Sequence, residues 1–331
     1  MKILVTGGGG FLGGAVVRAL LKRGDDVSCL QRGDYPELQQ LGVTIHKGDL
    51  ADKHTVTDAS RDCDMILHIA GLTGVWGPYE HYHHTNVIGT QSVIDACITN
   101  GISRLVYTSS PSVVFDGSDE ENLDETAPYP DTYFNHYQRT KATAEQLVLA
   151  ANNDWLSTVA LRPHLIWGPG DPHLIGRVIT RARTGRLRLA RNHNNLVDTT
   201  YIDNAVDAHL AAADRIGVGA ACAGKAYFIS NGEPLPMSAI INRILDAAGM
   251  RAIDKTLPDN LLYMIGQLSE WLYWSFNLKG EPVMTRFIAR QLCCSHWYNI
   301  SAARRDLGYQ PRVSVEQGMK ILEQYFSQAN K

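Results

Sequence analysis

A glycine-rich segment close to the N-terminus constrains the fold of this chain more than any other feature. The apolar run Ile3–Val5 leads directly into Thr6–Gly13, and a stretch with apolar residues at helical spacing follows. Gly7 permits a tight turn, Gly10 lets the backbone approach a pyrophosphate, and Gly13 permits close packing of the helix on the strand. Free N–H groups at the start of the helix then favour phosphate binding. The pattern predicts a dinucleotide-binding loop; the alternative is a merely flexible loop.

Apolar runs and helical patterns alternate through the first half of the chain. Such continuous apolar strands are typical of a parallel sheet that helices cover on both faces, and right-handed crossovers make it a doubly wound α/β (Rossmann) fold. The expected strands cover residues 3–5, 27–30, 43–45, 65–68, 105–107 and 158–161, and the main helices cover 11–22, 85–100 and 132–151.

The alternation stops after residue 168, where proline and glycine cluster. We therefore expect a nucleotide-binding Rossmann domain over residues 1–168 and a smaller, mostly helical substrate lobe over residues 169–331. Within the second half, residues 197–232 are expected to return to the Rossmann sheet through a strand at 226–229.

Composition excludes several classes of function. The 331 residues include 31 Lys and Arg against 34 Asp and Glu, so the chain lacks the excess positive charge of a broad nucleic-acid binder. No secretory-type apolar segment follows Met1, and the six scattered cysteines form no C-x-x-C pair, which favours a cytoplasmic protein with reduced thiols. His81, His83 and His84 cluster, but no spaced carboxylate or cysteine completes a ligand set, so we expect no metal.

The end of the second expected strand bears on which dinucleotide is bound. Sites for NAD(H) often carry an acidic residue there, which holds the adenosine ribose hydroxyls. Here the sequence reads Leu30–Gly33, and Arg32 can pair with a 2′-phosphate through two hydrogen bonds. We therefore expect NADP(H) rather than NAD(H). Asp34 is the alternative ribose ligand if the strand ends later.

Tyr137 and Lys141 are candidate acid–base residues on one expected helix. Positions i and i+4 share a helix face. A phenol with an ordinary pKa of about 10 is a poor acid–base group at neutral pH, and a nearby ammonium should lower that pKa. Ser110, 27 residues before Tyr137 at the end of the fifth expected strand, can bond a substrate oxygen. The alternatives are a surface helix pair and a capped turn.

These motifs resemble the extended short-chain dehydrogenase/reductases. The matching segments are Thr6–Gly13, Gly48–Leu50, His68–Gly71, Asn86–Thr90, Thr108–Ser110, the Tyr137/Lys141 pair and Arg162–Pro163. The resemblance implies that Tyr137 is the general acid, that Lys141 tunes it, and that Ser110 is its hydroxyl partner. It also implies a homodimer that pairs the helices at 85–100 and 132–151.

The same resemblance implies a set of nucleotide-binding residues, with Asp49 near the adenine and Pro163 beside the nicotinamide. The set is Gly7, Gly10, Phe11, Leu12, Gly13, Arg32, Asp49, Leu50, Ala70, Gly71, Tyr137, Lys141 and Pro163.

Residues 109–115, 161–172 and 197–204 resemble the 3β-hydroxysteroid dehydrogenase branch of that family. Residues 74–79 and 114–117 are further similar to its bacterial 2-alkyl-3-oxoalkanoate reductases of long-chain olefin biosynthesis. This resemblance implies NADPH-dependent reduction of the 3-keto group of a long-chain β-keto acid. The alternatives are oxidation of a sterol 3-hydroxyl, nucleotide-sugar epimerisation, and dinucleotide binding without turnover.

Two segments of the second half leave several interpretations open. Residues 261–278 form an apolar, aromatic helical stretch that could be a lid packed on the core, a wall of an alkyl-chain pocket, or a membrane-docking helix. Association with a membrane or with a pathway enzyme therefore remains a hypothesis. The six arginines between residues 177 and 191 are interpreted as a solvated helix face followed by a hairpin, in preference to an anion site.

Overall fold

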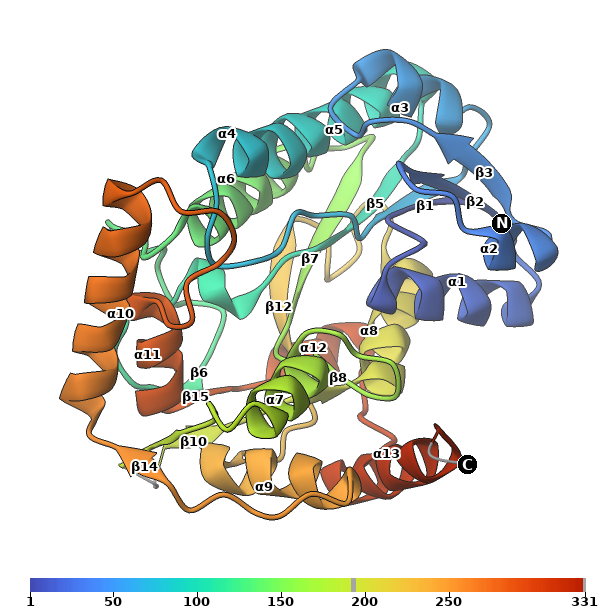
Figure 1. The fold of residues 1–331 in the computed structure, drawn as a ribbon. Helices are drawn as coiled ribbons and strands as arrows, with labels where there is room; N and C mark the ends of the chain where they lie inside the picture. Colours follow the sequence, from blue (N-terminus) through green and yellow to red (C-terminus); the bar gives the residue numbers. More distant parts are fainter. Residues whose placement is uncertain (192–194, 330–331) are drawn as a thin grey trace.

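A seven-stranded parallel sheet forms the centre of the computed structural model, which describes residues 1–191 and 195–329 (Figure 1). The strand order is β3–β2–β1–β4–β5–β7–β12, and every neighbouring pair is parallel. The strands are β1 (Lys2–Thr6), β2 (Asp26–Gln31), β3 (Thr44–Lys47), β4 (Met65–His68), β5 (Arg104–Thr108), β7 (Ser157–Pro163) and β12 (Lys225–Ile229). The doubly wound Rossmann sheet that the sequence predicts is thus confirmed, and β12 forms one of its edges next to β7.

Helices cover both faces of this sheet, because successive side chains of a strand point to opposite sides. On β1, Ile3 and Val5 belong to one apolar cluster and Leu4 to the other. The first face carries α1 (Phe11–Arg23), α8 (Ile202–Arg215) and α12 (Ser301–Leu307), and the second carries α3 (Lys53–Ala59), α5 (Gly89–Asn100) and α6 (His136–Ala150). Two short helices, α2 (Pro36–Gln40) and α4 (Tyr79–Tyr82), lie in connections.

The second half of the chain builds a lobe below the carboxyl ends of the strands (Figure 1). Its helices are α7 (Leu174–Arg183), α9 (Met237–Ala247), α10 (Asp259–Ser275), α11 (Arg286–Cys293) and α13 (Val315–Ala329). A small sheet runs in the order β13 (Leu235–Pro236), β10 (Leu196–Val197), β15 (His296–Tyr298) and β6 (Glu120–Leu123). Two further parallel pairs join β8 (Ile166–Trp167) to β11 (Thr200–Tyr201) and β9 (Leu189–Ala190) to β14 (Thr256–Leu257).

The structure corrects several local predictions. The helix expected at 132–151 begins at His136, because the Asn135 side chain caps it by accepting a hydrogen bond from Gln138 N at 2.9 Å. The helix expected at 85–100 begins with a π-helical turn, His83–Ile88. Among the described residues, those after the arginine-rich α7 form no hairpin; instead β9 pairs in parallel with β14, which is distant in sequence.

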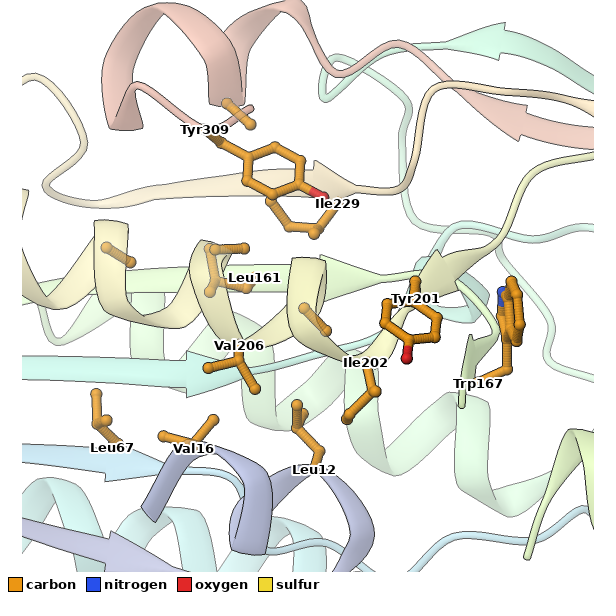
Figure 2. Close-up of a cluster of buried hydrophobic side chains, with 14 of the residues drawn as sticks. Leu12, Val16, Leu67, Leu161, Trp167, Tyr201, Ile202, Val206, Ile229 and Tyr309 are labelled. Atoms are coloured by element: carbon orange, nitrogen blue, oxygen red, sulfur yellow. The ribbon is translucent and has the colours of Figure 1, made fainter. Parts of the chain in front are cut away.

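The largest apolar cluster packs α1 and α8 against the sheet. Figure 2 shows Leu12 and Val16 of α1 facing Ile202 and Val206 of α8. Trp167 lies at the end of this cluster, fully buried, and its indole Nε1 donates to Thr199 Oγ1 at 2.9 Å. Within residues 1–191 and 195–329, no helix has the length and apolar character needed to cross a membrane.

We predict that Trp167→Ala lowers the free energy of unfolding by about 3–5 kcal/mol, because it leaves a cavity in this cluster and removes the bond to Thr199. Urea denaturation followed by circular dichroism measures this change. The matched control is Trp155→Ala, since Trp155 is 48% exposed and should change stability by about 0.5 kcal/mol or less. Equal losses in the two variants would contradict the prediction.

Candidate active site

A cavity of about 1010 Å³ lies between the carboxyl ends of the sheet strands and the lobe. Every residue that the sequence analysis assigned to catalysis or to nucleotide binding lines this cavity. They are Gly7, Gly10, Phe11, Leu12, Gly13, Arg32, Asp49, Leu50, Ala70, Gly71, Ser110, Tyr137, Lys141 and Pro163. The structure therefore brings together residues that are up to 156 positions apart in the sequence.

The glycine loop joins β1 to α1 with no room for side chains. Gly7 has a φ of +75°, and a Cβ atom there would lie 2.9 Å from Ala70 Cα. A Cβ on Gly13 would lie 2.1 Å from the Gly7 carbonyl oxygen. Gly10 N donates to the same oxygen at 2.9 Å and closes the turn before α1. The loop thus leaves bare backbone at the start of a helix, which is the geometry that a pyrophosphate requires.

The end of β2 presents polar groups to the same cavity. Gln31 is buried, and both polar atoms of its side-chain amide lack a hydrogen-bond partner within the described residues. Arg32 follows it and is exposed. Asp49 Oδ1 accepts a hydrogen bond from Ala51 N at 2.9 Å, which holds the pKa of that carboxyl below its usual value. Donors, acceptors and one cation therefore surround the position where an adenosine ribose would lie.

Sequence reasoning overlooked Gln31, although its place as the last residue of β2 was a usable signal. Asp34, the alternative ribose ligand, is exposed and pairs with Lys47 at 2.9 Å. It does not belong to the cavity wall. The bare loop and the unpartnered Gln31 amide together fit a dinucleotide.

The Tyr137/Lys141 pair projects from the first two turns of α6 into the cavity wall. The buried Lys141 Nζ donates to Thr108 O at 2.6 Å and lies 4.2 Å from the centre of the Tyr107 ring. Burial lowers the pKa of Lys141 to about 7. Ser110 Oγ lies 2.9 Å from Ser112 Oγ at the end of β5.

The expected acidification of Tyr137 by Lys141 is not what the structure shows. Burial raises the pKa of the Tyr137 phenol above its usual value, and the Ser110 hydroxyl is the group that lowers it. The physical reason is that the Lys141 ammonium is directed at the Thr108 carbonyl, and its own charged form is destabilised by burial. What changes is the group that lowers the pKa of Tyr137. The positions of Tyr137 and Lys141 in the cavity wall are as expected.

A buried ion pair fixes α6 to β7 behind these residues. Arg162 donates to both carboxylate oxygens of Glu145, at 2.6 and 3.0 Å, and Tyr129 OH donates to Glu145 Oε1 at 2.6 Å. Glu145 lies one helical turn after Lys141, so this pair sets the position of the lysine.

A chain of three buried side chains joins the end of β7 to the lobe. His164 Nδ1 lies 2.6 Å from Asp198 Oδ1, and His164 Nε2 lies 3.1 Å from His296 Nδ1. His296 Nε2 lies 2.8 Å from the carbonyl oxygen of Gln291 on α11. Both His164 and Gln291 line the cavity. This row of hydrogen-bonded residues therefore links the nucleotide side of the cavity to its lobe side. No sequence pattern predicts the two contacts of His164, because they join residues that are far apart in the sequence.

The lobe side of the cavity is mainly apolar. Phe287, Ile288 and Leu292 of α11 line it together with Leu262 and Ile265 of α10. Residues 261–278 thus contribute part of a pocket wall, which was one of the three interpretations left open by the sequence. Among the residues that the structure describes, no group of three or more His, Cys, Asp or Glu side chains could hold a metal ion.

A family model described as the 3-beta hydroxysteroid dehydrogenase/isomerase family matches residues 4–258. The chain belongs to this family. Its members are NAD(P)-dependent oxidoreductases of keto and hydroxyl groups, and the chain is accordingly such an oxidoreductase. The match covers the sheet, the glycine loop and most of the cavity wall.

Two curated relatives carry the name 2-alkyl-3-oxoalkanoate reductase. The one from Stenotrophomonas maltophilia is 53% identical over 98% of this chain and 98% of its own length. The one from Shewanella oneidensis is 47% identical over 96% of this chain and 84% of its own length. The solved structure of UDP-glucuronic acid 4-epimerase from Bacillus cereus in complex with NAD superposes with a TM-score of 0.76 at 23% identity, covering both chains completely, which supports the fold alone.

Glu120, next to this site, should make stability depend on pH. Its carboxyl accepts a hydrogen bond from Tyr298 OH at 2.6 Å, and burial raises its pKa from 4.5 to about 7. Between pH 4.5 and 7 the folded form binds more protons than the unfolded form, so stability falls as pH rises through this range.

We predict that wild type loses about 3 kcal/mol more than Glu120→Gln between pH 4.5 and 8, because glutamine keeps the acceptor and cannot ionise. Urea titrations of both proteins across this range measure the difference. Parallel stability curves would contradict the prediction.

Proposed function

We propose that this protein uses NADPH to reduce the 3-keto group of a long-chain 2-alkyl-3-oxoalkanoate, giving the 3-hydroxy acid, as a step of bacterial olefin biosynthesis. The observation that carries the proposal is one continuous cavity that combines the glycine loop, the Tyr137/Lys141/Ser110 set and an apolar wall. The names of the two curated relatives support the choice of substrate.

In this mechanism the dinucleotide, when bound, supplies the hydride for the keto carbon. Tyr137 donates its phenolic proton to the keto oxygen, and the high pKa that burial gives this phenol keeps it protonated until then. The Ser110 hydroxyl donates a hydrogen bond to the same oxygen. Lys141 would hold a ribose hydroxyl of the bound dinucleotide, and Pro163 would line the position of its nicotinamide. The apolar wall from α10 and α11 holds the alkyl chains and excludes water.

Tyr137→Phe should lower kcat at least about 100-fold, because it removes the proton donor and little volume. NADPH binding, measured by fluorescence titration, should remain unchanged and shows that the variant is folded. Tyr325→Phe is the control, since Tyr325 is an exposed tyrosine outside the cavity. Full turnover in the Tyr137 variant would refute the assignment.

The choice of NADPH over NADH rests on Arg32 and on the absence of an acidic residue at the end of β2. Arg32→Ser should raise the Kd for NADPH about 10- to 100-fold and leave the Kd for NADH nearly unchanged, because only NADPH carries the 2′-phosphate. Isothermal titration with both nucleotides measures this, and Arg61→Ser, which changes an exposed arginine outside the cavity, is the control. Tighter binding of NADH by wild type would refute the argument.

Oxidation of a sterol 3-hydroxyl is the second candidate, and the description of the matching family favours it. The same apolar wall suits a sterol as well as an alkyl chain. Rates with long-chain β-keto acids plus NADPH and with 3β-hydroxysterols plus NADP⁺ or NAD⁺ separate the two. Turnover of sterols alone would replace the proposed substrate.

A further inference from the structure

Helix α10 and the segment after it expose an unusual amount of apolar surface. On α10, Leu261, Met264, Leu268 and Trp271 repeat at intervals of three or four residues and so share one face. We define the α10 apolar face as these four residues together with the exposed apolar residues that follow them, which are Trp274, Phe276, Leu278 and Val283. Trp274 is 77% exposed and Met264 is 63% exposed. Exposed apolar residues that gather in this way along one helix and the segment after it are typical of an interaction surface.

The α10 apolar face adjoins the opening of the substrate cavity. Ile265 and Val283 line the cavity and are also exposed, at 37% and 55%. Gly266 faces the other way, where a Cβ would lie 2.7 Å from the Thr285 backbone at the start of α11. Helix α10 thus packs on α11 through one side and presents its other side outward, at the edge of the molecule in Figure 1.

Positive charge borders the same opening. Residues 174–191 contain six arginines and no acidic residue, in a chain whose net charge is −3. Arg177, Arg181, Arg186 and Arg188 line the cavity. Arg181 Nη2 donates to Val283 O at 3.0 Å, and Arg177 pairs with Glu281 at 2.9 Å. These contacts place the arginine-rich segment directly beside the α10 apolar face.

From these observations we propose that the α10 apolar face docks on the surface of an anionic lipid bilayer, with the arginines of residues 177–191 against the headgroups, so that the cavity opens toward the membrane. Tryptophan and phenylalanine favour the boundary between headgroups and acyl chains, and basic residues favour anionic lipids. The part concerning substrate entry rests on the proposed function, because a long-chain β-keto acid partitions into a bilayer.

Charge complementarity is the reason to choose a bilayer over a second copy of this chain. A contact between two copies across a two-fold axis would bring the arginine-rich segments near one another and create repulsion. A bilayer with anionic lipids takes up the apolar side chains and the arginines at the same time.

The test is sedimentation of the full-length protein with vesicles, without nucleotide or substrate. Vesicles of phosphatidylcholine alone are compared with vesicles that also contain phosphatidylglycerol. We expect binding to the anionic vesicles, which Trp271→Ser/Trp274→Ser weakens about tenfold or more. Arg183→Gln/Arg191→Gln, outside the cavity wall, should weaken binding to anionic vesicles about tenfold and leave the weak binding to phosphatidylcholine unchanged. Trp155→Ser, a change at an exposed tryptophan outside the cavity, is the matched control.

Three results would overturn the proposal. The first is that wild type binds neither kind of vesicle at low salt. The second is that the Trp271/Trp274 variant and the Trp155 control bind equally. The third is that the Trp271/Trp274 changes abolish a concentration-dependent dimer of wild type and not vesicle binding, which would assign the face to a second copy.

Reductase activity is measured separately, so that the two proposals fail in different ways. The Trp271/Trp274 variant should keep the kcat of wild type on a short, water-soluble 3-oxo acid and lose rate on a long-chain substrate embedded in vesicles. No activity of wild type on any 3-oxo acid would refute the proposed function and leave the vesicle result standing.

Discussion

Helix α1 can lie against strand β1 only because residue 13 has no side chain. A Cβ there would come within 2.1 Å of the Gly7 carbonyl oxygen, far closer than any real contact allows. This approach places the start of α1 beneath the carboxyl ends of β1 and β4, and it lets Leu12 and Val16 reach α8 in the main apolar cluster (Figure 2). The nucleotide half of the cavity and the packing of one sheet face thus both depend on the absence of a Cβ atom at Gly13.

The rest of the site depends on how β5, α6 and β7 are held together. Lys141 bonds the last carbonyl of β5, and the Arg162–Glu145 pair joins α6 to β7. Both contacts are buried, and loss of either member of the Arg162–Glu145 pair would leave a costly unpaired charge. β5, which leads into Ser110, is therefore fixed by polar contacts relative to α6 and β7, which carry Tyr137 and Pro163. The lobe side of the cavity is instead lined mainly by apolar side chains.

Local patterns were enough to predict the sheet and the nucleotide loop, because apolar strands, glycine turns and helical spacing act over a few residues. Three kinds of feature could not be predicted from these local patterns. The two-residue strands of the lobe have no periodicity of their own and form only where distant segments meet, as β9 and β14 do. The cause of the Tyr137 pKa depends on where the Lys141 amine points, and spacing along a helix does not determine that. The role of residues 261–278 depends on which side of α10 meets α11, and the apolar residues lie on both sides.

The Asp198–His164–His296 chain also determines where its protons lie. The Gln291 carbonyl can only accept, so His296 Nε2 must carry hydrogen, and burial, which lowers the pKa of His296 to about 3, keeps that ring neutral. His296 Nδ1 is then an acceptor, and His164 Nε2 must carry hydrogen as well. The remaining contact joins His164 Nδ1 to an oxygen of the Asp198 carboxylate at 2.6 Å. Both ring nitrogens of His164 and of His296 thus have a partner, so neither ring can turn without breaking two of the contacts that join β7 to α11.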